Sequence, residues 1–312
     1  MPLFSVRHVT TYRYKRPVSF GEHRMMFRPR DSYDQKLIEE RLVITPRPSR
    51  LRWIHDVFGN CVAIAQFDKR SDALRFDSFI RLDHTHSDAP HFETEEHAKT
   101  YPFSYDPEEL PDLAPFVERR YPDPDHQVAR WARRFVREGR ATDTGTLLMT
   151  MTTAIEESFV YERRHEAGTR DPAVTLMLGR GSCRDFALLM MEATRSLGFA
   201  ARFVSGYLYV PSRDGPGHRG GGSTHAWCQV YLPGAGWVEF DPTNGIVGNR
   251  DLIRVAVARD PRQAVPLWGT WTGLATESLG MTVEVNVGSE PGPGASSGPH
   301  ACADDYPSEF DV

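Results

Sequence analysis

The sequence predicts an α+β protein, with an N-terminal all-β, sandwich-like domain followed by a domain in which helices pack on an antiparallel sheet. Two observations support this class. Short alternating segments separated by turn residues run from about residue 4 to 84, which is typical of β structure. From residue 126 onwards, apolar residues recur first at helical spacing and then, after residue 198, as strands. We expect a β domain at 1–100, a linker at 101–125, a mixed domain at 126–288 and a disordered tail at 289–312.

The expected β domain has a clear strand pattern but no recognisable catalytic motif. Its candidate strands are separated by polar breaks and cover residues 6–14, 42–45, 51–55, 61–67 and 74–82. This pattern predicts a sandwich or an open barrel with a scaffolding or substrate-presenting role. Proline and acidic residues dominate residues 102–124, which favours a connection between domains.

Three main helices are expected in the second domain. Asp125 is a candidate N-cap for a helix that ends at Gly139, and a second helix covers about residues 144–159. The third begins near Cys183 and ends at Gly198, which suits the left-handed position that closes a helix. Its apolar positions recur at helical spacing: Phe186, Leu189, Met190, Ala193 and Leu197. Strands are then expected at 201–210, 224–232 and 236–243.

Composition excludes several classes of function. The net charge of −5 and the isoelectric point near 6.2 argue against a nucleic-acid-binding protein, which would carry a basic face. The cysteines at positions 61, 183, 228 and 302 form no paired motif, so we expect reduced thiols. The N-terminus lacks a signal-peptide pattern, and no apolar run approaches the ~20 residues that span a bilayer. We therefore expect a cytoplasmic protein with no membrane partner.

Two motifs that could hold a cofactor are weak. His84, His86 and His91 lie close together in the sequence, but their spacing matches no standard zinc pattern, so a solvated linker is the better interpretation. The glycine-rich residues 212–223 precede a strand rather than a helix and lack a Gly-Lys-Ser/Thr sequence, which argues against a phosphate-binding loop. We expect a loop that borders a cleft, and no metal or other cofactor.

Cys183, His225 and Asp241 form a candidate catalytic triad. A helix N-terminus carries partial positive charge, which stabilises a thiolate and so suits a nucleophilic cysteine. With a three-residue turn at 233–235, Trp227 lies opposite Asp241, and His225 lies diagonally on the same face, within reach of the carboxylate. A two-residue turn would place the two side chains on opposite faces. Each residue also has an ordinary interpretation, as a packed cysteine, a structural histidine and a turn aspartate.

The order of these residues along the chain, with the cysteine at a helix start, is also that of papain-like thiol enzymes. Four segments carry a closer resemblance: Gly181-x-Cys183-x-Asp-Phe-Ala, Leu197-Gly-Phe-Ala-Ala-Arg-Phe-Val-Ser-Gly-Tyr207, His225-Ala-Trp227 and Gly236-Trp-Val-x-Phe-Asp241-Pro-Thr243. With them the chain resembles the bacterial transglutaminase-like family, a branch of the papain-like superfamily. His8-x-Thr-x-Tyr-x-Tyr-x-x-Pro-Val18 with Arg28-Pro-Arg30 resembles that family's N-terminal β domain, and Arg259-Asp260 with Val265-Pro266-Leu-Trp-Gly-Thr270 resembles its C-terminal strands. The resemblance covers roughly residues 2–288.

The resemblance implies a transglutaminase-core domain that includes the C-terminal strands up to residue 288. It also implies that Cys183 is the nucleophile, His225 the general base and acid, and Asp241 the orienting group. Animal transglutaminases use an upstream tryptophan in the oxyanion hole, and none lies between residues 131 and 183 here. Tyr161 is a candidate donor in its place. No acidic cluster has calcium-loop spacing, so calcium is not implied.

The implied reaction is acyl transfer from peptide or protein amide bonds through a thioester on Cys183. Water as the acceptor would make the protein a peptidase or amidase, and an amine would make it a transglutaminase. Two alternatives stay open: a catalytically silent member that only binds peptides, and a metal-dependent hydrolase. The intact candidate triad favours the thiol enzyme. Asp185, in the first turn of the helix, is expected to support the helix start rather than to react.

Overall fold

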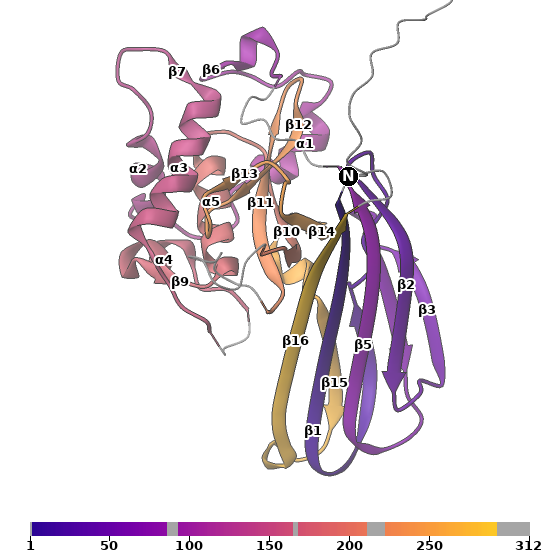
Figure 1. Ribbon diagram of the computed structural model, residues 1–312. Helices are drawn as coiled ribbons and strands as arrows, with labels where there is room; N and C mark the ends of the chain where they lie inside the picture. The colour runs from indigo at the N-terminus through magenta and orange to yellow at the C-terminus, as the bar shows by residue number, and fades with distance from the viewer. Residues whose placement is uncertain (1, 86–92, 165–167, 211–221, 292–312) are drawn as a thin grey trace, which may run out of the picture.

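The structure, a computed structural model, describes residues 2–85, 93–164, 168–210 and 222–291. The predicted α+β class is confirmed. Helices and a short-stranded sheet form one part of the molecule, and long strands form the other (Figure 1). None of the helices within these residues is both long and apolar enough to cross a membrane.

The long strands form a sandwich-like sheet that is organised around β1. Its members are β1 (Pro2–Met25), β2 (Gln35–Thr45), β3 (Arg50–His55), β4 (Cys61–Gln66), β5 (Ser71–His84), β15 (Leu267–Thr272) and β16 (Ser278–Pro291). The first half of β1 pairs with β5 and β16, whereas its second half pairs with β4 and β15. One strand therefore belongs to two layers. Apolar side chains from both layers, among them Phe20, Met25 and Phe76, pack between them.

The C-terminal strands lie in this sheet rather than in the second domain, so their predicted placement is wrong. In Figure 1 the yellow β16 runs beside the indigo β1, and residues 2–14 of β1 pair with residues 278–291. The sequence pattern identifies a strand, but it does not identify which exposed strand edge that strand will complete. Residues 289–291, expected in the tail, also belong to β16, and residues 292–312 lie outside the described residues.

The expected linker contains regular structure. It holds β6 (Thr100–Tyr101) and α1 (Leu110–Val117), and η1 (Glu96–Ala98) directly precedes it. Pro111 stands in the first turn of α1, where a missing N–H costs nothing, and Leu113 is buried. Proline therefore marks a helix start here as well as a connection.

The second part of the molecule has a five-stranded antiparallel sheet in the order β13-β12-β11-β10-β14. These strands are β10 (Ala201–Leu208), β11 (His225–Leu232), β12 (Gly236–Asp241), β13 (Ile246–Val247) and β14 (Leu252–Ala258). The helices are α2 (Gln127–Arg133), α3 (Thr144–Ser158), α4 (Pro172–Leu178) and α5 (Cys183–Ser196). Short elements complete it: β7 (Thr142–Asp143), β8 (Val160–Tyr161), β9 (Arg180–Gly181) and η2 (Pro261–Gln263). One more short element, η3 (Ala275–Glu277), joins β15 to β16 in the N-terminal sheet.

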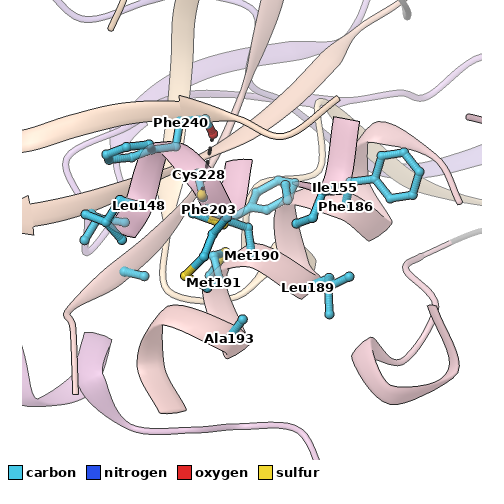
Figure 2. Close-up of a cluster of buried hydrophobic side chains, with 14 of the residues drawn as sticks. Leu148, Ile155, Phe186, Leu189, Met190, Met191, Ala193, Phe203, Cys228 and Phe240 are labelled. Atoms are coloured by element: carbon cyan, nitrogen blue, oxygen red, sulfur yellow. Dashed lines mark hydrogen bonds between the residues drawn. The ribbon is translucent and has the colours of Figure 1, made fainter. Parts of the chain in front are cut away.

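Helix α5 is the centre of this part. Its apolar side chains pack against those of α3 and of the sheet, and Phe186, Leu189 and Met190 are fully buried (Figure 2). The predicted end of the helix is confirmed, because Gly198 has φ of +93° and its N–H donates to the Arg195 carbonyl. The helix is buried on nearly all sides, and its polar residues Glu192 and Arg195 form an ion pair at 2.9 Å.

Helix α2 begins and ends differently from the prediction. The capping position belongs to His126, which has a left-handed φ of 51°, rather than to Asp125. The carboxylate of Asp123 instead accepts hydrogen bonds from the N–H groups of Val128 and Ala129. The helix ends at Arg133, before the expected stop at Gly139. The local sequence pattern did not predict that Asp123, several residues before the helix, would accept hydrogen bonds from its first turn.

Strands β10 and β14, at one edge of the five-stranded sheet, pack on the N-terminal sheet. Phe4 and Ile80 of the N-terminal sheet share a buried cluster with Tyr207 and Ile253 of the second part. Asn60 adds two polar links: its side chain donates to the Val257 carbonyl and accepts from the Val257 N–H. The five-stranded sheet is therefore covered by helices on one face and contacts the N-terminal sheet along its β14 edge.

Candidate active site

Cys183 is the first residue of α5 and is 7% exposed. Asp185, two residues later, accepts a hydrogen bond from the Ser182 N–H at 2.9 Å, which closes the start of the helix. The same carboxylate accepts from the Arg164 guanidinium at 2.7 Å and from the Arg170 N–H at 2.6 Å. Asp185 therefore supports the helix start as expected, and it ties the preceding loop to the turn that carries the thiol.

The hairpin of β11 and β12 has the predicted register. Leu232 pairs with Gly236 across a three-residue turn, and Cys228 pairs with Phe240 further along. Continuing this register places Trp227 opposite Asp241, with His225 one pair further on the same face. The odd-length turn thus brings the histidine and the aspartate together.

His225 and Asp241 form a buried pair. The His225 Nε2 and the Asp241 Oδ2 are 2.8 Å apart, and both side chains are fully buried. Asp241 also accepts from the Thr243 N–H at 2.9 Å and from the Asn244 amide at 2.8 Å. Although burial raises the pKa of the Asp241 carboxyl, the charge of His225 and these hydrogen bonds hold it below its ordinary value. Asp241 is therefore held as a carboxylate.

The second ring nitrogen of His225 is the one available for chemistry. Within the described residues, this buried Nδ1 has no hydrogen-bond partner. Burial alone lowers the pKa of His225, but Asp241 and then Cys183 raise it to about 10. The ring is therefore cationic near neutral pH, with the carboxylate on one nitrogen and the thiol group as a close electrostatic neighbour.

Comparison with known families agrees with this geometry. Residues 129–242, which include the cysteine, the histidine and the aspartate, match the model of the transglutaminase-like superfamily. Residues 4–82 match the model of the bacterial transglutaminase-like N-terminal region. Residues 129–242 therefore form a domain of the transglutaminase-like superfamily. The family resemblance stated from the sequence motifs is thereby confirmed.

Relatives of this transglutaminase-like protein occur in mycobacteria. The uncharacterized protein ML0607 of Mycobacterium leprae is 40% identical over 107 residues, a match that spans 34% of this chain and 37% of that protein. The uncharacterized protein Rv2569c of Mycobacterium tuberculosis is 27% identical over 297 residues, which is 91% of each chain. The crystal structure of a candidate cysteine protease from Cytophaga hutchinsonii has a TM-score of 0.69 at 19% identity, covering 92% of this chain and 90% of that one. This likeness supports the transglutaminase-like fold.

Tyr161, the candidate oxyanion donor, lies near the thiol of this transglutaminase-like site. It belongs to β8, which pairs in parallel with β9 so that Tyr161 is opposite Gly181, two residues before Cys183. Burial, and after it the neighbouring Cys183, raises the pKa of Tyr161 to about 12. The phenol therefore keeps its proton and can donate a hydrogen bond near the sulfur.

The sequence analysis missed the groups that surround the pair. Asn244 supports Asp241, and Trp227 stacks on His225 with ring centroids 5.9 Å apart and an angle of 27° between the planes. Glu239 lies behind Trp227 and accepts a hydrogen bond from the indole N–H. One signal was available in the sequence: Glu239 shares the face of Asp241 two residues away, an unusual place for a carboxylate in a buried strand.

The other candidate motifs do not join this site. His84 is buried in β5, with its Nε2 3.1 Å from the Leu252 carbonyl, and His86 and His91 lie outside the described residues. The described part of the chain holds no group of three or more His, Cys, Asp or Glu side chains suited to a metal ion. Of the glycine-rich loop, residues 212–221 also lie outside the described residues.

Proposed function

We propose that this protein is a thiol-dependent enzyme that cleaves or transfers acyl groups of peptide or protein amide bonds through Cys183, His225 and Asp241. One observation carries the proposal: His225 is bonded to Asp241 through Nε2, while its unbonded Nδ1 and Cys183 share one buried site. A nucleophile, a base and a group that orients the base are the parts that covalent acyl transfer requires.

The first half-reaction forms a thioester. The sulfur of Cys183, as a thiolate paired with the cationic His225, attacks the carbonyl carbon of the amide and forms a C–S bond. The carbonyl electron pair moves to oxygen and then returns as the C–N bond breaks. His225 gives its proton to the leaving nitrogen, so ammonia or an amine departs neutral. Asp241 keeps the ring oriented and stabilises its cationic form throughout.

The oxyanion of the tetrahedral intermediate needs hydrogen-bond donors. We propose the N–H of Cys183, which lies in the first turn of α5 where backbone donors have no helical partner, as one of them. The phenol of Tyr161, whose raised pKa keeps it protonated, is proposed as the second. Removing one such donor costs about 10²–10³ in rate in other acyl-transfer enzymes.

The second half-reaction decides the class of enzyme. His225, now neutral, takes a proton from water or from an amine as that nucleophile attacks the thioester carbon. The C–S bond breaks, and the thiolate and the imidazolium are restored. Water gives a peptidase or amidase, and a primary amine gives a transglutaminase.

The test is to trap the thioester. The protein is incubated with a mixed peptide library, quenched in acid and digested, and acyl adducts on cysteine-containing peptides are read by mass spectrometry. We expect an adduct on the Cys183 peptide that disappears in His225→Ala and that hydroxylamine removes. Adding a primary amine separates the two acceptors, because a transglutaminase incorporates it into the product.

Cys228→Ser is the matched control. Cys228 is also buried and lies on the same strand as His225, but its sulfur faces the Phe240 carbonyl at 3.5 Å. This variant should keep the Cys183 adduct. If Cys183→Ser and wild type both bind peptides and neither forms an adduct or turns peptides over, the protein is a binding module of the same fold and the proposed function is wrong.

A further inference from the structure

Trp227 covers one face of the catalytic histidine. The hydrogen bond between His225 and Asp241 fixes one ring nitrogen, but a single hydrogen bond leaves the ring free to tilt about that contact. The stacked indole of Trp227, which is fully buried, restricts this tilt. Gly206, the residue paired with His225 on β10, makes room for the indole, because a Cβ at position 206 would overlap both Trp227 and the Ile253 carbonyl.

Glu239 fixes the indole in turn. Its carboxylate accepts the Trp227 N–H on one oxygen, and on the other it accepts from Gln229 at 2.7 Å and from the Arg254 guanidinium at 2.7 Å. Glu239 is only 4% exposed, and burial raises the pKa of its carboxyl. A buried carboxylate with three donors has one favoured position, so it holds the indole in one place.

Arg254 connects this carboxylate to the N-terminal sheet. Its second terminal nitrogen donates to Asp34 at 2.9 Å and to the Ser32 hydroxyl at 3.2 Å. Asp34 is 5% exposed and also accepts from the Asn249 amide at 2.9 Å. The one guanidinium therefore bridges a carboxylate of the second part, Glu239, and a carboxylate just before β2 of the N-terminal sheet.

We propose that the N-terminal β domain positions the catalytic histidine through a series of side-chain contacts that runs from Asp34 through Arg254 and Glu239 to Trp227. These four are positioning residues, because each acts on His225 through its neighbour and none needs to touch the substrate. The proposal rests on the proposed function, since it assigns a role to these residues in the same site. It gives the N-terminal domain a part in the reaction beyond that of a scaffold.

The physical effect is on the thiolate and imidazolium pair. If Trp227 moves, the ring of His225 tilts and its Nδ1 moves relative to the Cys183 sulfur, because Asp241 still holds the other nitrogen. A misplacement of ~1 Å can cost about 10²-fold in the rate of a positioned reaction. A substitution that breaks this series of side-chain contacts, even far from the thiol, should therefore lower the fraction of reactive thiolate at acidic pH.

The test needs no substrate. The rate of iodoacetamide alkylation of Cys183 is measured between pH 5 and 9 by peptide mass spectrometry, in wild type and in Asp34→Asn, Glu239→Gln and Trp227→Phe. Asp34→Asn and Glu239→Gln keep the shape of the side chain and remove its charge, and Trp227→Phe keeps an aromatic ring but removes the indole N–H that binds Glu239. We expect the rate at pH 6 to fall about three- to tenfold in each variant, with the acidic limb of the profile moved to higher pH. The double variant of Asp34 and Glu239 should lose less than the product of the two single effects.

Asn60→Ala is the matched control. It removes two hydrogen bonds across the same interface, to the N–H and carbonyl of Val257. It leaves the side-chain contacts from Asp34 to Trp227 intact. Its profile should match that of wild type. Near-ultraviolet circular dichroism shows whether each variant is folded. A second pair of variants tests Arg254: Arg254→Gln should slow the alkylation of Cys183, and Arg254→Lys, which keeps the charge, should lose less of the rate.

The outcomes separate this inference from the proposed function. If wild-type Cys183 reacts no faster than Cys61 at pH 6, the paired thiolate is absent and the proposed function fails. If wild-type Cys183 is activated and folded Asp34→Asn and Glu239→Gln keep its profile, the proposed function stands and the positioning role is wrong. A shift in Asn60→Ala equal to that in Asp34→Asn would also overturn it, because the effect would then belong to the interface as a whole.

Discussion

The two faces of strand β11 are equally buried, yet they are held by different forces. Ala226, Cys228 and Val230 face the helices and join an apolar cluster, in which Figure 2 labels Cys228. His225 and Trp227, on the other face, are paired with the carboxylates of Asp241 and Glu239. The first face is stabilised by the removal of apolar surface from water, which many combinations of side chains achieve.

The second face depends on matched polar partners. A buried polar group is costly unless it is paired, so each of these side chains needs one specific neighbour in one specific place. The difference is plain in two cysteines: burial raises the pKa of Cys228 well above that of an ordinary thiol, whereas Cys183, also buried, lies beside the cationic His225. The four predictions below test this division.

Asp241→Ala should have the largest effect, because it leaves His225 buried without its counter-charge. We expect the free energy of unfolding at pH 7 to fall by about 3–5 kcal/mol and Cys183 alkylation at pH 6 to fall at the same time. Urea unfolding and peptide mass spectrometry measure the two quantities. Asn244→Ala, which removes one supporting hydrogen bond, is the milder control at about 1 kcal/mol. An unchanged stability in Asp241→Ala would show that the pair is not ionised.

Leu189→Ala tests the apolar face. Leu189 is fully buried in α5, so its truncation should lower the free energy of unfolding by about 2–5 kcal/mol. Because the side chain has no role in the polar pair, the pH profile of Cys183 alkylation in the folded protein should stay that of wild type. The same two measurements apply. A displaced profile would mean that the two faces are not independent.

Gly206→Ala should affect both faces moderately. The added methyl group overlaps Trp227 and the Ile253 carbonyl, so the strands must shift. We expect a loss of about 1–3 kcal/mol in the free energy of unfolding and a slower alkylation of Cys183 at pH 6. Ser205→Ala, at the neighbouring position of β10, is the control and should leave the alkylation profile alone. Equal profiles for the two variants would argue against the role of the indole.

The pH dependence of stability should be the most gradual effect, because it is spread over several pH units. The pKa of His225 is raised to about 10 in the folded protein, so its contribution is fully present below the ordinary histidine value of about 6.5 and is lost as pH rises towards 10. Each pKa unit corresponds to about 1.4 kcal/mol. Urea unfolding between pH 6 and 10 should show this decline, and Asp241→Asn should flatten it. The lowered pKa of Asp241 acts in the opposite direction, with its contribution lost as pH falls below about 4.

The sequence by itself determined the local parts of this protein. The period of apolar residues and a closing glycine specify α5, because helix spacing and the left-handed position are properties of a few consecutive residues. The three-residue turn at 233–235 specifies the register of the hairpin, because side chains alternate strictly along a strand. These two facts were enough to propose Cys183, His225 and Asp241 together, although their catalytic roles stay a prediction, as do the expected cytoplasmic location and the peptide substrate.

Only the tertiary structure decided which distant segments meet. Strand β16 has the pattern of a strand but pairs with β1 at the other end of the chain, and the helix-capping carboxylate of Asp123 acts from outside the local motif. The link from Asp34 to Glu239 joins residues that are 205 positions apart through Arg254. No local pattern encodes such partners, because a buried charge is satisfied by whichever group the packing of the whole chain brings within hydrogen-bond distance.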